Sequence, residues 1–351
     1  MLIVARRQRQ AVALCGVMSC TISAAGCGDD SERRGTREQL VVGEAPAGFP
    51  AGPLSATGPS ENPLTEAGAR LGQRLFFDKV LSRTGDITCA TCHEQRHAFS
   101  DPRPVSLGVE GRAGTRNAPT LVNLAWGQHF FWDGRARTLE EQAGRPIENP
   151  VEMDMPIADA VTRLASDDGY VDAFQAAYGA RPSEASLRKA LASFIRTLVS
   201  GHSAYDRFLG GDEGALDAGS RRGQALFFGK AACFHCHPPG ALTNDGFFNN
   251  GTYVEGGDVG RQGISGLPGD LGKFKVPGLR NVAVSAPYMH DGSLATLDDV
   301  IDQYDHGGRG DGSTDPLVEP LALASDEKQD LLAFLLALTD EAFLSDPRFQ
   351  P

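Results

Sequence analysis

Two short motifs of the same composition stand far apart in the chain. Each has two cysteines separated by two residues and followed directly by a histidine: Cys89, Cys92 and His93, and then Cys233, Cys236 and His237. Two thiols at this spacing can form thioether bonds to the vinyl groups of a haem, and the adjacent histidine can reach the iron. Disulfides and zinc sites also use such residues. Neither requires a histidine after both pairs, so the sequence predicts two covalently bound c-type haems.

The segments around the two motifs match each other. The matching stretches are AGARLGQRLFFDK at 67–79 with AGSRRGQALFFGK at 218–230, and PTLVNLA at 119–125 with PGLRNVA at 277–283. In the same register, Trp132-Asp-Gly matches His290-Asp-Gly. Because each copy contains one haem motif, the pattern indicates an internal duplication of one haem-binding unit. The difference between Trp132 and His290 indicates that the two units have different tasks.

Helical periodicity dominates the rest of the chain. Apolar residues at helical spacing predict helices near 187–198, 297–304 and 326–338, whereas the Gly-rich stretch 246–272 predicts a loop. Strand patterns are almost absent. The expected fold is therefore all-α, with two cytochrome-c-like haem domains related by internal duplication and joined by long ordered loops.

The composition is acidic and globular, with 33 Lys and Arg against 45 Asp and Glu and a formal charge of −12. Binding to nucleic acid is not expected, because phosphate neutralisation needs a basic surface. No stretch reaches the roughly 18 uninterrupted apolar residues of a membrane span.

The first 27 residues have the pattern of an export signal. Three arginines within the first nine residues precede an apolar stretch at 11–26 that ends in small residues. Ala24-Ala25-Gly26-Cys27 resembles a lipoprotein cleavage site, which predicts a lipid on Cys27. A plain cleaved signal peptide is the alternative. Location in the periplasm or cell envelope follows from either, with membrane contact only through the N-terminal lipid.

These patterns divide the chain into four parts. The expected parts are an export signal at 1–27, a flexible tether at 28–62, an N-terminal haem domain at 63–205 and a C-terminal haem domain at 206–351.

Several longer motifs resemble those of the bacterial di-haem cytochrome c peroxidase / MauG family. They are RNAPT at 116–120, FWDGR at 131–135, PVEM at 150–153, FKVP at 274–277 and APYMHDG at 286–292. The resemblance extends from about residue 63 to 351. It implies reduction of hydrogen peroxide at the N-terminal haem, with electrons entering through the C-terminal haem. The electron donor would be a small redox protein, such as a cytochrome c or a cupredoxin, or an oxidised protein side chain.

The resemblance assigns roles to three residues of the N-terminal unit. Glu152 matches the family's distal glutamate, Gln142 matches a nearby distal glutamine, and Trp132 matches a tryptophan that relays electrons between the haems. Peroxide cleavage needs an acid/base group that moves a proton from one peroxide oxygen to the other. Taken alone, Glu152 would be interpreted as a solvated or capping carboxylate and Trp132 as a core aromatic.

The resemblance also predicts a tyrosine ligand for the C-terminal haem iron. Tyr304 stands where members with a methionine ligand place that methionine, as in MauG-type members. A phenolate is a hard anionic ligand and would lower the potential of this haem. The iron would then have His237 and Tyr304 as its ligands, with His290 or Met289 as alternatives. A hydrogen-bonded core tyrosine is the other interpretation of Tyr304.

A calcium ion between the domains is implied as well. Asn117, Ser285 and Pro287 match the family positions that bind it, and Ser285 replaces the more usual threonine. The ligand at that position is a backbone carbonyl, and calcium prefers oxygen donors.

Three classes of function follow from these residues. The first is a peroxidase. The second is a MauG-like enzyme that oxidises residues of a partner protein through a high-valent di-haem state. The third is a plain di-haem electron carrier, which Glu152 argues against because a carrier keeps both irons six-coordinate.

One stretch departs from the pattern of family members that need reductive activation. Those members carry a histidine after the first haem motif that blocks the first iron, whereas VSLGVEG at 105–111 has none. We predict that the N-terminal haem is five-coordinate or weakly water-ligated in the resting ferric state and reacts with peroxide without prior reduction. Absorption and EPR spectra of the oxidised protein test this, and a low-spin bis-histidine signal from that haem would contradict it.

Overall fold

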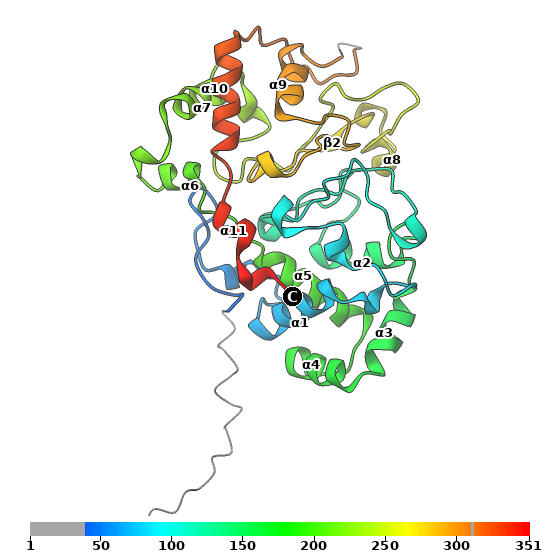
Figure 1. The fold of residues 1–351 in the computed structure, drawn as a ribbon. Coiled ribbons are helices and arrows are strands. Elements are labelled where there is room, and N and C mark those ends of the chain that lie inside the picture. Colours follow the sequence, from blue (N-terminus) through cyan, green and yellow to red (C-terminus); the bar gives the residue numbers. More distant parts are fainter. Residues whose placement is uncertain (1–38, 310–311) are drawn as a thin grey trace, which may run out of the picture. The chain divides into compact units, whose positions relative to one another are not determined.

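The computed structural model describes residues 39–309 and 312–351, and helices make up most of their regular secondary structure (Figure 1). Within them, the only sheet pairs two short antiparallel strands, β1 (Phe247–Phe248) and β2 (Phe274–Lys275). The predicted export signal and Cys27 lie outside the described residues. No helix in the described part of the chain has both the length and the apolar character needed to cross a membrane.

Eleven α-helices occur in the described ranges. They are α1 (Glu66–Phe77), α2 (Leu139–Glu148), α3 (Ile157–Ala165), α4 (Asp168–Tyr178), α5 (Glu184–Thr197), α6 (Ala204–Leu209), α7 (Ala218–Phe228), α8 (Gln262–Ser265), α9 (Leu297–Asp305), α10 (Ser325–Leu336) and α11 (Glu341–Ser345). The predicted helices correspond to α5, α9 and α10, so the helix-rich fold is confirmed. Thr296 begins α9 with a capping box that also uses Asp299.

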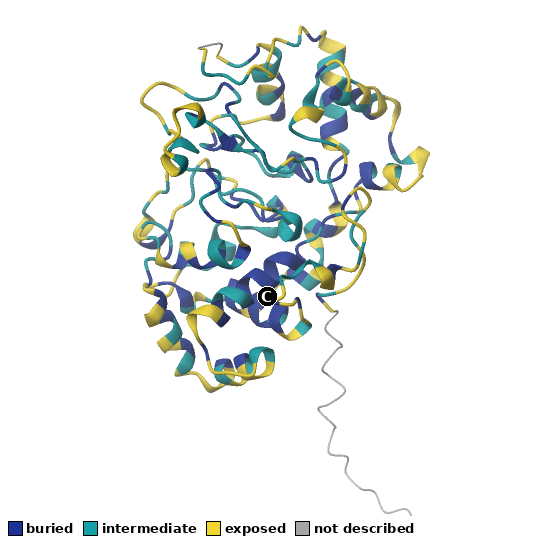
Figure 2. Ribbon diagram, turned by 180° about the vertical axis from the view of Figure 1, so that it is seen from behind, coloured by how far each residue is buried: buried dark blue, intermediate teal, exposed yellow. Residues whose placement is uncertain are grey.

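The described residues form one compact unit, but their buried apolar side chains fall into two clusters. The first is centred on α1 and α5, where Phe76 packs against Phe194, and its buried helices lie beside the C-terminus in Figure 2. The second is centred on α7 and α10, where Phe227 packs against Phe334. The chain end beyond α10 returns to the first cluster through Phe343 and Phe349 (Figure 1).

The predicted flexible tether is too long. Leu40 and Leu54 are buried in the first cluster, and Phe49 packs against Trp126 with ring centroids 4.5 Å apart. The backbone N–H of Leu40 also donates to the carboxylate of Glu66 on α1, at 2.9 Å. Residues 39–62 therefore belong to the packed body. Their few apolar side chains are buried against residues distant in sequence, which the local composition alone does not show.

The two clusters are built around the same kind of helix contact. A Cβ atom at Gly72 of α1 would lie 2.8 Å from the Cβ of Phe194 on α5, and one at Gly223 of α7 would lie 2.9 Å from the Cβ of Phe334 on α10. The helices approach this closely because both contact positions lack a side chain. Gly72 and Gly223 are equivalent in the sequence match between 67–79 and 218–230.

Backbone features repeat farther along as well. Asn123 and Asn281 both have φ of 60°, although neither is a glycine, and each precedes a short 3-10 turn. The isolated bridge between Phe130 and Ala136 has a counterpart between Tyr288 and Leu294. These pairs occupy matching positions of the sequence repeat, so the two halves share local geometry as well as sequence.

The close contact at Gly72 predicts a large effect of one methyl group. Ala favours a helix over Gly by about 1 kcal/mol, but a Cβ here would collide with the backbone of Ala190, which cannot move aside. We expect Gly72→Ala to lower the free energy of unfolding by about 1–3 kcal/mol, measured by thermal or denaturant unfolding. Gly219→Ala is the control, since its Cβ would meet nothing closer than 3.4 Å. Equal stability of the two variants would contradict the prediction.

Candidate active site

Both cysteine–histidine motifs adopt the same local structure. Each cysteine pair lies on a short 3-10 turn, Cys89–Thr91 or Cys233–His235. His93 Nδ1 lies 2.7 Å from the carbonyl oxygen of Phe99, and His237 Nδ1 lies 2.7 Å from that of Leu242. Because a carbonyl only accepts, each Nδ1 must carry the hydrogen, which leaves Nε2 free to bind a metal.

The protonation state of these groups suits haem attachment. Burial lowers the pKa of His93, and it lowers the pKa of His237 to about 4, so both imidazoles are neutral at pH 7. None of the four motif cysteines forms a disulfide in the described part of the chain. Among the described residues, no group of three or more His, Cys, Asp and Glu side chains could hold a metal ion. This donor set fits covalent haem better than a disulfide or a zinc site.

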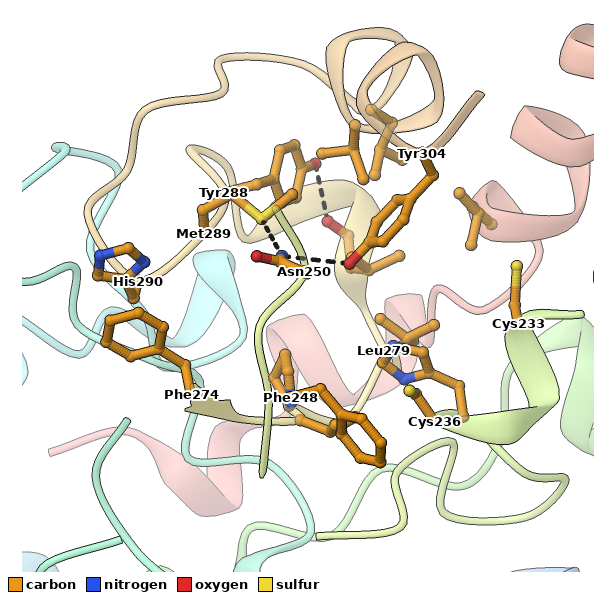
Figure 3. A pocket seen from close by; sticks show the side chains of 18 of the residues that line it. Cys233, Cys236, Phe248, Asn250, Phe274, Leu279, Tyr288, Met289, His290 and Tyr304 are labelled. Atoms are coloured by element: carbon orange, nitrogen blue, oxygen red, sulfur yellow. Dashed lines mark hydrogen bonds between the residues drawn. The ribbon is translucent and has the colours of Figure 1, made fainter. Parts of the chain in front are cut away.

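A cavity extends from the second motif to α9 (Figure 3). Its polar wall contains Cys233, Cys236, His237, Asn250, Met289 and Tyr304, and its apolar wall includes Leu279, Leu297, Val300, Ile301 and Leu331. Two thiols, an imidazole and a phenol are thus brought together within an apolar enclosure. Such a cavity suits a flat, largely apolar cofactor that is fixed at one edge through sulfur.

Tyr304 and Met289 reach this cavity next to each other. Asn250 Nδ2 donates to the sulfur of Met289 at 3.1 Å and to the hydroxyl oxygen of Tyr304 at 3.3 Å (Figure 3). Burial raises the pKa of Tyr304 to about 12, so the hydroxyl stays protonated unless a metal binds it. Asn250, which the sequence analysis did not identify, joins both candidate ligands and lies in a Gly-rich loop with no recognisable motif.

His290 has a different setting from these two side chains. It also lines the cavity, but its ring stacks on Phe274 with centroids 3.6 Å apart and an interplanar angle of 13°. Its carbonyl oxygen accepts the backbone N–H of Asn117 at 2.8 Å. The structure therefore makes Met289 a better alternative ligand to Tyr304 than His290.

The N-terminal site contains a partly buried carboxyl. Asn149 Nδ2 donates to Glu152 Oε1 at 2.6 Å, and burial raises the pKa of Glu152 above its ordinary value. Burial also raises the pKa of the Cys89 thiol to about 12, and the charge of Glu152 acts in the same direction, so the carboxyl lies within electrostatic reach of the first motif. The sequence analysis did not identify Asn149. It stands only three residues before Glu152, so a search for nearby hydrogen-bond partners of Glu152 would have found it.

Gln142 supplies a second polar atom on this side. Its Oε1 atom is buried on α2 and has no hydrogen-bond partner within the described part of the chain. A buried acceptor without a donor is uncommon in a folded protein. It indicates that a hydrogen-bond donor is needed at this position. The pairing of Glu152 and Gln142 as distal residues remains a prediction.

Trp132 connects the two halves. Its indole Nε1 donates to the carbonyl of Asn117 at 2.9 Å, and its own carbonyl accepts the backbone N–H of Lys275, on β2, at 2.7 Å. The ring lines the cavity of the second motif although it belongs to the first repeat. Asn117, Ser285 and Pro287, the predicted calcium residues, line that same cavity.

Comparisons with known proteins identify the family. Residues 66–214 match the family described as "Di-haem cytochrome c peroxidase". Over 293 residues the chain is 41% identical to "Methylamine utilization protein MauG" from Methylorubrum extorquens, covering 82% of this chain and 83% of that one. Over 287 residues it is 34% identical to "Cytochrome c551 peroxidase" from Pseudomonas aeruginosa, covering 79% and 80%.

A solved structure gives the same answer. The crystal structure of "a MauG-like protein associated with microbial copper homeostasis" superposes with a TM-score of 0.79 and 38% identity, covering 83% of this chain and 95% of that one. The chain belongs to the di-haem cytochrome c peroxidase family. Membership implies haem as the cofactor and confirms the resemblance that its motifs predicted.

The cavity geometry predicts a spectral role for Tyr304. We expect Tyr304→Phe to change the absorption spectrum and raise the potential of the C-terminal haem while leaving the N-terminal haem nearly unaltered, because an anionic oxygen ligand is lost. Tyr288→Phe is the matched control: Tyr288 lines the same cavity, but its hydroxyl donates to the carbonyl of Val282 at 2.9 Å. A Tyr304→Phe protein with the parent spectrum and potential would assign the ligand to another residue, with Met289 first.

Proposed function

We propose that this protein is a periplasmic, peroxide-dependent oxidoreductase that reduces hydrogen peroxide at its N-terminal haem centre. The observation that supports this most directly is Glu152, a partly buried carboxyl held by Asn149 within electrostatic reach of the first cysteine pair. Thioether bonds from Cys89, Cys92, Cys233 and Cys236, with His93 and His237 as iron ligands, would hold two haems. When bound, haem supplies the redox chemistry for cleaving the oxygen–oxygen bond.

Glu152 performs the proton transfer in this proposal. Reduction of one peroxide consumes two electrons and two protons and releases two waters. The carboxylate takes a proton from one peroxide oxygen and returns it to the other, which leaves as water. Burial raises the pKa of Glu152 toward the working pH, which makes the carboxylate a better base. The unpartnered oxygen of Gln142 can accept a hydrogen bond from the peroxide.

Electrons enter in this proposal through the C-terminal centre. Trp132 serves as the electron relay. The position of Trp132 supports this role, because it lines the second cavity although it belongs to the first repeat. A small redox protein, such as a cytochrome c or a cupredoxin, is the donor.

A MauG-like reaction, in which residues of a partner protein are oxidised, is the second candidate. The observation that favours it is the position of Tyr304 in the second cavity. A tyrosine ligand suits a haem of low potential, and such a haem would accept electrons poorly from a donor protein of high potential. Relatives with both names are similar to the chain over most of its length.

Four further points belong to the same proposal. The repeated helix contacts and backbone turns support an internal duplication, with haem domains near 63–205 and 206–351.

A calcium ion would be held by Asn117, Ser285 and Pro287 through an amide oxygen and two backbone carbonyls. Asn117 Nδ2 donates to the carbonyls of Arg103 and Pro104, so the side-chain oxygen of Asn117 remains available as an acceptor. Export and a lipid on Cys27 rest on the N-terminal sequence.

Turnover with peroxide and a reduced small cytochrome distinguishes the two candidates. Fast turnover supports the peroxidase. Slow turnover with the cytochrome, together with peroxide-dependent oxidation of side chains in a partner protein, supports the MauG-like reaction.

The role of Glu152 gives a sharp prediction. Glu152→Gln should slow the reaction with peroxide by roughly 10²–10⁴-fold, because the amide cannot accept the proton. The parent rate should fall as the pH drops through the pKa of Glu152, at a higher pH than an ordinary glutamate would give, since the protonated form is inactive as a base. Stopped-flow absorption with hydrogen peroxide measures both effects.

Glu148→Gln is the matched control for this experiment. Glu148 ends α2, pairs with Arg188 at 3.2 Å and is exposed. Both variants should keep two attached haems. A Glu152→Gln protein that reacts at nearly the parent rate would remove Glu152 from the mechanism.

A further inference from the structure

The loop at 105–112 lies directly on the segment that carries Glu152. The backbone N–H of Val109 donates to the carbonyl of Glu152 at 2.8 Å, and the side chain of Val109 is fully buried. A Cβ at Gly108 would lie 2.6 Å from the Cα of Glu152. The loop therefore touches the backbone of Glu152 without a side chain between them.

Four charged side chains close this contact from the outside. Arg83 donates to Glu110 and to Asp154, each at 2.8 Å. Arg112 donates to Asp154 at 3.0 Å and also contacts Glu110. Each carboxylate thus accepts from both arginines, and we call Arg83, Glu110, Arg112 and Asp154 the charge ring. It joins the loop to the segment 149–154 and to the turn that contains Arg83.

Both acidic members of the charge ring have an unfavourable backbone conformation. Glu110 has φ of 58° and Asp154 has φ of 50°, in the left-handed region that a non-glycine residue seldom adopts. Such residues persist where surrounding contacts hold them. Two further bonds act on the same segment: Arg83 N donates to the carbonyl of Met153 at 2.9 Å, and Arg112 Nη1 donates to that of Pro150 at 2.7 Å.

We propose that the charge ring positions Glu152 by keeping the loop 105–112 closed on the segment 149–154. This rests on the proposed role of Glu152 in moving the peroxide proton. With the loop closed, Glu152 stays partly shielded from water and in contact with the amide of Asn149. The other groups that act on Glu152 are the guanidinium of Arg135 and the two sulfur atoms of the first motif.

The attraction between the side chains of the charge ring depends on ionic strength. These side chains are between 27% and 49% exposed, so dissolved salt screens their attraction. Several mutually paired charges stabilise a contact more than one exposed pair does. When the loop opens, water reaches Glu152 and its pKa falls toward that of an ordinary glutamate.

Two measurements on the resting, haem-loaded protein test the proposal in Glu110→Gln, which keeps the size of the side chain and removes its charge. Hydrogen exchange of peptides covering 105–112 should become about 3–10-fold faster. The carboxylic-acid band of Glu152, assigned in difference infrared spectra by its loss in Glu152→Gln, should titrate at lower pH than in the parent. High NaCl should produce both changes in the parent and little further change in Glu110→Gln.

Glu148→Gln should leave exchange and titration at the parent values, because its partner Arg188 lies outside the ring. Gly108→Ala tests the contact without altering charge, since its Cβ would collide with the backbone of Glu152, and it should move the titration in the same direction. Gly114→Ala is its control, with no atom closer than 3.8 Å to the added Cβ.

Unchanged exchange in Glu110→Gln would overturn the proposal, and so would faster exchange with an unshifted Glu152 titration. Neither readout depends on turnover. If Glu152→Gln reacts normally with peroxide, the proposed role of Glu152 in proton transfer fails, while the infrared and exchange results still decide whether the ring positions Glu152.

Discussion

The hydrogen bond from each motif histidine to a backbone carbonyl is the interaction on which both centres depend. It fixes the imidazole ring, its tautomer and the direction of its free nitrogen before any ligand binds. The acceptors come from Phe99 and Leu242, which have φ of 55° and 52° although neither is a glycine. Both side chains are fully buried, so packing in the two clusters holds the strained turns that supply the carbonyls.

The two motif histidines are held in the same way, so the two halves differ in their other polar side chains. The N-terminal half has the partly buried carboxyl of Glu152 and, on α2, the unpartnered amide oxygen of Gln142. The cavity of the second motif has a phenol and a thioether that share one amide donor. Similar local frames can therefore support different chemistry.

The sequence analysis predicted the features that local patterns encode. Helix periodicity located α5, α9 and α10. The paired close contacts at Gly72 and Gly223 fall within the matching stretches, but the sequence analysis did not predict them. Contacts between distant segments were not predictable in the same way. Leu40 and Phe49 lie in a stretch rich in Pro and Gly that looks like a linker, and only the surfaces they cover show otherwise. Asn250 and the charge ring were missed for the same reason, since their partners are distant in sequence.

The return of the chain end to the first cluster has a consequence for the order of assembly. Gln73 of α1 donates to the carbonyls of Arg348 and Gln350, each at 2.7 Å, and Phe343 packs against Phe99, whose carbonyl holds His93. A nascent chain emerges from the ribosome N-terminus first. Its first cysteine–histidine motif is therefore synthesised long before the residues that complete the surrounding core, whereas the second motif and its core follow within a shorter stretch. The first motif therefore stands in an unfinished domain until the end of the chain has been synthesised.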